Sequence, residues 1–414
     1  MIGAAVSHIA FLSIPSHGHI IPTLDVVREL VRRGHRVTYV TTEEFAGTVA
    51  AAGAEPVRYA STAARYQEAS TYQREEVMGI LMMSLEEGTG ALDALEPVLR
   101  ADRPDLLVYD LTLYTAGRAA SRKHGIPAVQ TFPIFASNER FSLAHRVFQR
   151  AGGAVGVLNG GDSGGLEFLT ALRDWLERYL PGGGASAFEV LTTVEPLNLV
   201  FLPREFQIEQ QLFDERFQFV GPCQDLEPGG QWQPPGDGRP VVLASLGTTY
   251  GSAKFFRMCA EAFAGLPLHM VMTTGDKFDV AELGPLPSNI EARPWVPHLD
   301  VLAHAGVLVT QGGMSSTMQA LALGVPLVVV PHGGENAVNA DRLAELGCGT
   351  LLPPEELTAA ALRRAVTETL ADEGMREAAV RMSRHVAAAG GAPRAAEVLE
   401  ARIAEAVAAG RAAA

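Results

Sequence analysis

The amino-acid sequence predicts an α/β protein built from two doubly wound parallel-sheet domains. Short, continuously apolar segments alternate with amphipathic helical patterns along almost the whole chain. The length of 414 residues exceeds that of one ordinary α/β domain. A stretch rich in proline, glycine and aspartate at residues 224–240 interrupts the alternation. Because apolar strands that alternate with helices are buried on both faces, we expect the sheets to be parallel.

The first half repeats a strand–helix rhythm. Strands are expected at residues 8–14, 35–41, 56–60, 105–110 and 127–133, and helices at 21–33, 43–52, 75–100 and 114–124. Two glycine-rich stretches, 152–165 and 182–185, are expected to be loops, either at the mouth of a site or as plain surface insertions. Segments 197–203 and 217–222 close this half.

The second half restarts the alternation after the proline-rich stretch. Strands are expected at 240–247, 268–274, 306–310 and 325–331, and helices at 253–263, 314–323, from 335 onward, and at 358–370, 373–388 and 392–409. We therefore expect a first domain at 1–222, a linker at 223–239, a second domain at 240–390, and a helix at 391–414 that returns to the first domain. A single elongated domain with a helical cap is the alternative, and the composition of the linker disfavours it.

Composition limits the classes of partner and the compartment. The formal net charge of −14 and the absence of long basic runs disfavour nucleic acid and anionic membrane as partners. The cysteines Cys223, Cys259 and Cys348 are odd in number and far apart, so neither a disulfide framework nor a zinc cluster is expected. The first residues lack a basic region and are interpreted as a strand rather than a signal peptide. A cytoplasmic protein, monomeric or homodimeric, is the expectation.

The second half carries the strongest functional pattern. A buried strand ends at Gly312-Gly313 and continues directly into a helix that opens with Ser315 and Ser316. Free backbone N–H groups and hydroxyls at a helix N-terminus suit a diphosphate. A second loop, at Gly247-Thr248, follows a neighbouring strand of the same expected sheet. Upstream, the indole of Trp295 is placed to stack on a nucleotide base, or alternatively to anchor the core.

The first half offers a candidate general base. Ser16-His17-Gly18-His19 follows the first strand, where a dehydrogenase would carry GxGxxG, so a nicotinamide oxidoreductase is disfavoured. An imidazole held by a carboxylate is a natural base at neutral pH. Asp110 ends another strand at the same edge of the sheet. The alternatives are a structural histidine and a metal pair formed by His17 and His19, for which no third ligand lies at a suitable spacing.

Several motifs along nearly the whole chain resemble the macrolide glycosyltransferases. They are HIAFLSIPSHGHIIPTLDVVRELVRRGHRVTYVTT, RPDLLVYD, LPREFQ, FDERFQFVGP, GRPVVLASLGT, the block WVP…GGMSSTMQAL…GVPLVVVP, and AAGGAPRAAEVLEA. The resemblance implies the GT-B fold, in which two Rossmann-like domains face each other across a cleft. It also implies inverting transfer of a hexose or deoxyhexose from a UDP- or TDP-sugar to a hydroxyl of a bulky hydrophobic natural product, such as a macrolide, polyketide or flavonoid.

The same resemblance assigns roles to individual residues. His19, in its GHxxP context, is the expected base, and Asp110 is its carboxylate partner. No essential metal and no cofactor beyond the nucleotide-sugar co-substrate are implied. The expected donor-binding residues are Gly247, Thr248, Trp295, Val296, His298, Gln311, Gly313, Met314, Ser315, Ser316, Gln319, Glu335 and Asn336. The expected acceptor-binding residues are Met82, Met83, Phe132, Ile134, Phe135 and Phe141, because methionine and aromatic side chains suit bulky apolar ligands.

Four positions depart from the pattern of the family. Gln311 stands where the family usually has His, Gln319 where it has an acidic residue that grips ribose hydroxyls, His298 where it has Gln, and Asn336 where it has Gln. One interpretation is a TDP-sugar donor, whose deoxyribose lacks the 2′-hydroxyl. The other is that amides replace acids without a change of donor. A non-catalytic nucleotide-sugar binder, acting as auxiliary partner of another transferase, is the competing hypothesis, although such a protein need not keep His19 and Asp110.

Overall fold

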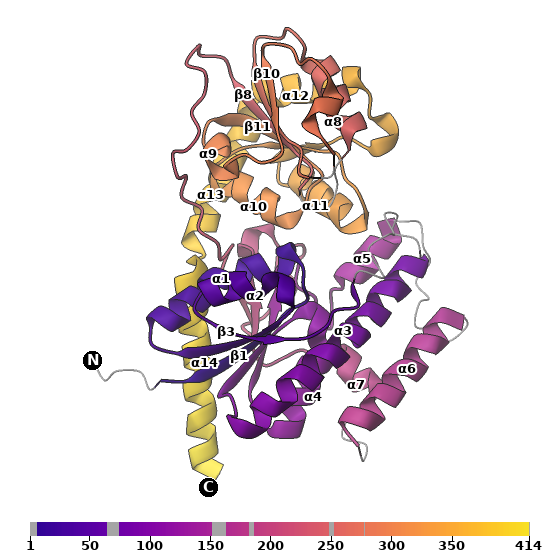
Figure 1. The fold of residues 1–414 in the computed structure, drawn as a ribbon, viewed down its shortest axis with the longest axis vertical. Coiled ribbons are helices and arrows are strands. Elements are labelled where there is room, and N and C mark those ends of the chain that lie inside the picture. The colour runs from indigo at the N-terminus through magenta and orange to yellow at the C-terminus, as the bar shows by residue number, and fades with distance from the viewer. Residues whose placement is uncertain are drawn as a thin grey trace. The chain divides into compact units, whose positions relative to one another are not determined.

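The computed structural model describes residues 6–63, 74–150, 163–181, 186–247, 252–276 and 278–413 (Figure 1). The chain divides into two compact units, Met1–Gln224 with Ala389–Ala414, and Asp225–Ala388. Each unit is a parallel sheet covered by helices, which confirms the predicted fold class. No helix among the described residues is long and apolar enough to cross a membrane.

The first unit contains a seven-stranded sheet in the order β3-β2-β1-β4-β5-β6-β7, with every neighbouring pair parallel. Its strands are β1 (His8–Leu12), β2 (Arg36–Thr41), β3 (Glu55–Arg58), β4 (Leu106–Asp110), β5 (Ala128–Phe132), β6 (Asn198–Val200) and β7 (Phe217–Phe219). The strand order reverses between β1 and β4, where Ile9 pairs with Leu106. Open parallel sheets bind ligands beyond the carboxyl ends of their strands at such a reversal.

Helices cover both faces of this sheet. They are α1 (His17–Arg32), α2 (Glu43–Ala51), α3 (Arg74–Ala101), α4 (Tyr114–His124), α5 (Leu143–Arg150), α6 (Ser163–Tyr179), α7 (Ala187–Thr192) and α14 (Gly391–Ala413), with short 3-10 helices η2 (Leu111–Leu113), η3 (Arg204–Phe206) and η4 (Gln210–Leu212). The residues of β1 and β4 are buried throughout because both faces are covered. Helices α5, α6 and α7 were not predicted from the sequence.

Helix α14 joins the first unit from the far end of the sequence and contacts α1 (Figure 1). Its apolar side chains Ala395, Leu399 and Ile403 belong to the same core cluster as β1. On its flank, Glu400 accepts hydrogen bonds from Arg33 Nη1 at 2.7 Å and from His35 Nε2 at 3.0 Å. The core on this side of the sheet is therefore completed by the last helix of the chain.

The second unit contains a six-stranded parallel sheet in the order β10-β9-β8-β11-β12-β13. Its strands are β8 (Val241–Ser245), β9 (His269–Thr273), β10 (Ile290–Arg293), β11 (Ala305–Thr310), β12 (Leu327–Val329) and β13 (Gly349–Leu351). Its helices are α8 (Ala253–Phe263), α9 (His298–Leu302), α10 (Met314–Ala322), α11 (Gly334–Glu345), α12 (Ala359–Ala371) and α13 (Glu373–Ala388), with η5 (Val280–Leu283) and η6 (Pro354–Glu356). The short outer strands β10 and β13 were not predicted.

The proline-rich segment after residue 224 is fixed to the second unit. Gly230 N and Gln231 N donate to the Asp300 carboxylate at 3.0 and 2.5 Å. The indole of Trp232 is 7% exposed, and its Nε1 donates to Glu291 Oε1 at 3.2 Å. Burial acts to raise the pKa of Asp300, but hydrogen bonds from backbone N–H groups of this segment outweigh it and lower the pKa below its usual value. The segment is thus held by its backbone hydrogen bonds to Asp300 and by the buried indole of Trp232.

Candidate active site

An imidazole and a carboxylate meet at the carboxyl edge of the first sheet. His19 Nδ1 lies 2.9 Å from Asp110 Oδ2, with the His19 side chain 19% exposed and that of Asp110 2% exposed. Helix α1 begins at His17, four residues earlier than the sequence predicted, so both histidines lie in its first turn. Pro22 lies inside the helix close to this start and removes only one helical hydrogen bond.

The structure fixes Asp110 from its other side. Asp110 Oδ1 accepts hydrogen bonds from Thr112 N at 2.9 Å and from Thr112 Oγ1 at 2.5 Å, which caps η2. The remaining oxygen, Oδ2, is therefore directed to His19. A carboxylate oxygen accepts hydrogen bonds, so this contact favours the tautomer with the proton on Nδ1, in which Nε2 is the acceptor nitrogen of the ring. Thr112 was not singled out from the sequence, although its place two residues after a strand-end aspartate is typical of such a turn.

The acceptor-binding candidates fall into two groups. Phe132, Phe135 and Phe141 are at most 6% exposed. They pack against other rings of this unit: Phe135 stacks on Phe206 with centroids 5.5 Å apart, Phe141 packs edge-on against Phe213, and Phe132 packs against Phe217. Met82, Met83 and Ile134 are only half-buried. We therefore keep Met82, Met83 and Ile134 as the candidates with surface to offer a ligand.

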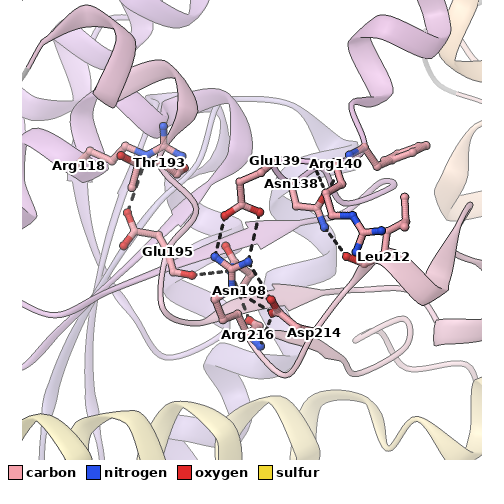
Figure 2. A network of polar contacts seen from close by, with 11 residues as sticks. Arg118, Asn138, Glu139, Arg140, Thr193, Glu195, Asn198, Leu212, Asp214 and Arg216 are labelled. Carbon is pink, nitrogen blue, oxygen red and sulfur yellow. Dashed lines mark hydrogen bonds and ion pairs between the residues drawn. The ribbon is translucent and has the colours of Figure 1, made fainter.

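Polar contacts hold the segment that follows β5. Figure 2 shows Arg216 reaching both Glu139 and Asp214, at 2.8 Å in each case. Asn138 Nδ2 donates to Leu212 O at 2.8 Å in the same view. The Arg216 guanidinium holds the pKa of Glu139 below its usual value. The loop that carries Ile134 is thus tied at its far end to the segment leading into β7.

In the second unit, the chain turns sharply from β11 into α10. Gly312 has φ +90°, and a Cβ there would meet Val329 Cγ1 at 2.7 Å, so only glycine fits. Asn339 Nδ2 donates to Gly312 O at 2.8 Å and fixes the turn. Gly313 is the N-cap of α10, and no side chain caps the helix there. The first N–H groups of α10, from Met314 to Ser316, therefore point out of the helix end, as an anion site requires.

Gln311 lies at the centre of the candidate donor site. A Cβ added to Gly247 would lie 3.0 Å from Gln311 Nε2, and one added to Gly313 would lie 3.8 Å from it. The structure therefore brings Gly247, Gln311 and Gly313 together. The Gln311 side chain is 8% exposed, and its Oε1 has no hydrogen-bond partner among the described residues. The Thr248 candidate lies outside the described residues.

His298 at the start of α9 and Gln319 on α10 are both half-buried and form a neutral pair. Burial lowers the pKa of His298 to about 4, and a hydrogen bond with the Gln319 side chain offsets only part of that effect. His298 is therefore uncharged at neutral pH.

The other donor candidates differ in exposure. Trp295 is 71% exposed, which excludes the interpretation as a core anchor, whereas Val296 and Met314 are buried at 2% and 6%. Asn336 Nδ2 donates to His332 O at 2.7 Å at the start of α11, and Glu335 precedes it in the same turn. Groups of three or more His, Cys, Asp or Glu side chains arranged to hold a metal ion do not occur in the part of the chain that the structure describes.

Comparison with known proteins assigns the family. Residues 264–404 match the family described as erythromycin biosynthesis protein CIII-like, C-terminal domain, and residues 18–195 match the glycosyl transferase 4-like domain. Demethyllactenocin mycarosyltransferase of Streptomyces fradiae is 36% identical over 405 residues, covering 95% of this chain and 86% of the relative. This chain belongs to the macrolide glycosyltransferases.

Two further likenesses agree with that assignment. The NDP-glycosyltransferase YjiC of Bacillus licheniformis is 37% identical to this glycosyltransferase over 409 residues, covering 96% of this chain and 98% of the relative. The crystal structure of CalG4, the calicheamicin glycosyltransferase, has a TM-score of 0.87 and 40% identity, covering 97% of this chain and 99% of that one. The fold of this glycosyltransferase is accordingly GT-B.

Proposed function

We propose that this glycosyltransferase transfers a hexose or deoxyhexose from a nucleotide diphosphate sugar to a hydroxyl of a bulky hydrophobic natural product, with inversion at the anomeric carbon. The contact of 2.9 Å between His19 and Asp110 carries the proposal, because it leaves one basic nitrogen at the carboxyl edge of the sheet. Relatives named for mycarosyl transfer to demethyllactenocin and for oleandomycin glycosylation support the class of acceptor.

The proposed reaction begins on the first unit. His19 Nε2 takes the proton of the acceptor hydroxyl while the hydroxyl oxygen attacks the anomeric carbon and the bond from that carbon to the diphosphate breaks. Asp110 holds the ring in the required tautomer and stabilises the imidazolium that forms. A positioned base of this kind contributes roughly 10²–10⁴-fold to the rate.

The second unit has the groups to bind the donor and stabilise the leaving diphosphate. We assign the diphosphate to the N–H groups at the start of α10 and to the Gln311 side chain, whose Nε2 donates without carrying charge. Trp295, which is 71% exposed, offers a free face to the nucleotide base. Ser315 and Ser316 add hydroxyl donors, and Glu335 with Asn336 is assigned to the sugar hydroxyls.

The test is a mass-spectrometric screen of a small panel of aglycones against several UDP- and TDP-sugars, with His19→Ala in parallel. We expect a product heavier by one sugar with the wild-type protein, and a loss of at least about 10²-fold in rate with the variant. The product should have the anomeric configuration opposite to that of the donor. Retained configuration, or an undiminished rate in the variant, would contradict the proposed mechanism.

The neutral pair of His298 and Gln319 favours a TDP-sugar as donor. Gln319 can hydrogen-bond a ribose but cannot bind two hydroxyls as a carboxylate does. A deoxyribose lacks one of these hydroxyls. A TDP-sugar therefore loses less binding free energy than a UDP-sugar when Gln319 stands in place of the carboxylate. Steady-state kinetics with TDP-glucose and with UDP-glucose test this preference. A strong preference for UDP-glucose would refute it.

We further propose that the reaction needs no metal ion or other cofactor, because Gln311 and the α10 terminus supply the donors for the leaving group. Dialysis against EDTA should leave the rate unchanged, and a loss restored by Mg²⁺ would contradict this. We place the protein in the cytoplasm, where its buried free cysteines Cys223, Cys259 and Cys348 remain reduced. A non-catalytic role as auxiliary partner predicts that the wild-type protein binds a nucleotide sugar without transferring or hydrolysing it.

A further inference from the structure

A buried carboxylate holds the loop that follows β3. Glu87 on α3 is 1% exposed. Its Oε2 accepts a hydrogen bond from Tyr59 Oη at 2.7 Å. Its Oε1 accepts from Ser61 Oγ at 2.9 Å, Thr62 N at 2.6 Å, Thr62 Oγ1 at 3.2 Å and Ala63 N at 3.0 Å. One oxygen atom thus fixes three consecutive residues of the loop.

The same part of α3 packs closely against α4 and against the residue that follows β3. A Cβ at Gly88 would lie 2.6 Å from Thr115 Oγ1 of α4, and one at Gly90 would lie 3.0 Å from Tyr59 Cδ2. These glycines let the helix approach α4 and the end of β3 closely. The loop and the helix are therefore joined at Glu87, and neither can shift there without breaking buried contacts.

This junction lies at the functional edge of the sheet. Strands β3 and β4 are parallel members of one sheet, so the loop after β3 leaves the same edge as Asp110. Helix α3 also contacts η2, the segment that directly follows Asp110. Met82 and Met83, the half-buried acceptor candidates, lie on α3 little more than one helical turn before Glu87.

We propose that Glu87 is a positioning residue for acceptor binding: it locks residues 61–63 against α3 and so sets the wall of the acceptor site that includes Met82 and Met83. The carboxylate does not take part in proton transfer. The inference rests on the proposed glycosyl transfer, and it assigns to the loop after β3 a part in the choice of acceptor.

The two carboxylate oxygens of Glu87 accept different numbers of hydrogen bonds, and this difference provides a test. In Glu87→Gln, the amide oxygen can occupy the position of Oε1 and keep the bonds from the loop, while Tyr59 Oη turns to accept from the amide nitrogen. In Glu87→Leu, both acceptor oxygens of this side chain are lost, so Thr62 N loses its carboxylate partner and Ala63 N keeps only its bond to Ser61 Oγ. Glu96→Gln is the matched control, because Glu96 lies on the same helix but pairs with Arg100, Lys123 and His124 instead.

The measurements are the KM of an acceptor that the wild-type protein glycosylates, the rate of donor hydrolysis without acceptor, and the melting temperature. For Glu87→Leu we expect the acceptor KM to rise about tenfold, equivalent to 1.4 kcal/mol, with donor hydrolysis unchanged. Glu87→Gln and Glu96→Gln should stay within about threefold of the wild-type acceptor KM, which corresponds to less than 1 kcal/mol.

Three results would overturn the inference: an unchanged acceptor KM in Glu87→Leu, a parallel fall in donor hydrolysis, or equal damage from Glu87→Gln. If Glu87→Leu does not fold, the double variant Ser61→Ala/Thr62→Val decides, because it removes hydroxyl donors and leaves the carboxylate its backbone partners. An unchanged acceptor KM in that variant is then the contrary result. A wild-type protein that neither transfers nor hydrolyses a donor refutes the proposed function instead.

Discussion

Replacing Asp110 by asparagine tests how the imidazole is made basic. Asparagine keeps the shape of the side chain, and its oxygen can still accept from Thr112 N and Thr112 Oγ1, so the cap of η2 survives. Its NH₂ group then replaces Oδ2, the atom 2.9 Å from His19 Nδ1. Because an amide nitrogen can only donate, Nδ1 must accept and the ring proton moves to Nε2. His19 then has no basic nitrogen to offer the acceptor.

The expected loss follows from that change of tautomer. General base catalysis contributes roughly 10²–10⁴-fold, so kcat for transfer should fall by about that factor. The donor KM should not change, because the donor-binding residues proposed above all belong to the second unit. Initial rates measured by chromatography with mass detection, with a thermal melt of each protein, provide the assay.

A matched variant separates the tautomer from the turn. Thr112→Val removes only the hydroxyl that donates to Asp110 Oδ1 and keeps the backbone N–H, so its kcat should stay within a few-fold of wild type. The reasoning is refuted if Asp110→Asn keeps more than about a tenth of the wild-type kcat. It is also refuted if Thr112→Val is as damaging as Asp110→Asn.

Three further predictions concern the second unit. Gly312→Ala should cost about 1–3 kcal/mol through its left-handed backbone and should lower the melting temperature more than Gly275→Ala, because Gly275 has φ +68° but open space around it. Equal losses would contradict the close contact of Gly312 with Val329. Gln311→Glu should raise the donor KM at least about tenfold, because like charges brought together on binding cost several kcal/mol; a donor titration that shows no change refutes the assignment of the diphosphate. The pKa of His298 is about 4 in the folded protein, against an ordinary value of 6.5 for a solvated histidine, so the unfolded chain binds a proton first as the pH falls. Stability should therefore decline between pH 6.5 and 4, by at most about 3 kcal/mol from this residue. His298→Gln should flatten that decline in urea titrations, and an unchanged slope would show that the ring is solvated.

The sequence was sufficient to predict the two parallel sheets but not all of their elements. Strands such as β1 and β8 are buried throughout, so their continuous apolar runs stand out from the amphipathic helices around them. Strands β10 and β13 have only four and three residues and are partly exposed at the sheet edges, so their apolar signal is weak. A local sequence pattern indicates a strand through its buried apolar side chains, and these two short strands have too few of them to be told from a loop.

In the candidate site, too, local sequence patterns predict only part of the arrangement. The nearness of His19 and Asp110 can be inferred because their strands are neighbours and leave the sheet at one edge. The bonds of Glu87 to residues 61–63 and of Asn339 to Gly312 join segments about 25 residues apart, and no local periodicity encodes them. Burial of the Phe135 ring on Phe206 likewise depends on packing between distant segments, so an aromatic run alone could not distinguish a pocket wall from the core.

The return of α14 to the first unit has a consequence for biosynthesis. The second unit is one uninterrupted stretch, Asp225–Ala388, and all of its residues leave the ribosome before α14 does. The first unit lacks Ala395, Leu399 and Ile403 until then, although most of its chain was made earlier. During translation the later-made unit can therefore complete its fold first, and a nascent chain halted near residue 390 would expose the apolar side chains of α1 that α14 otherwise covers to chaperones and proteases.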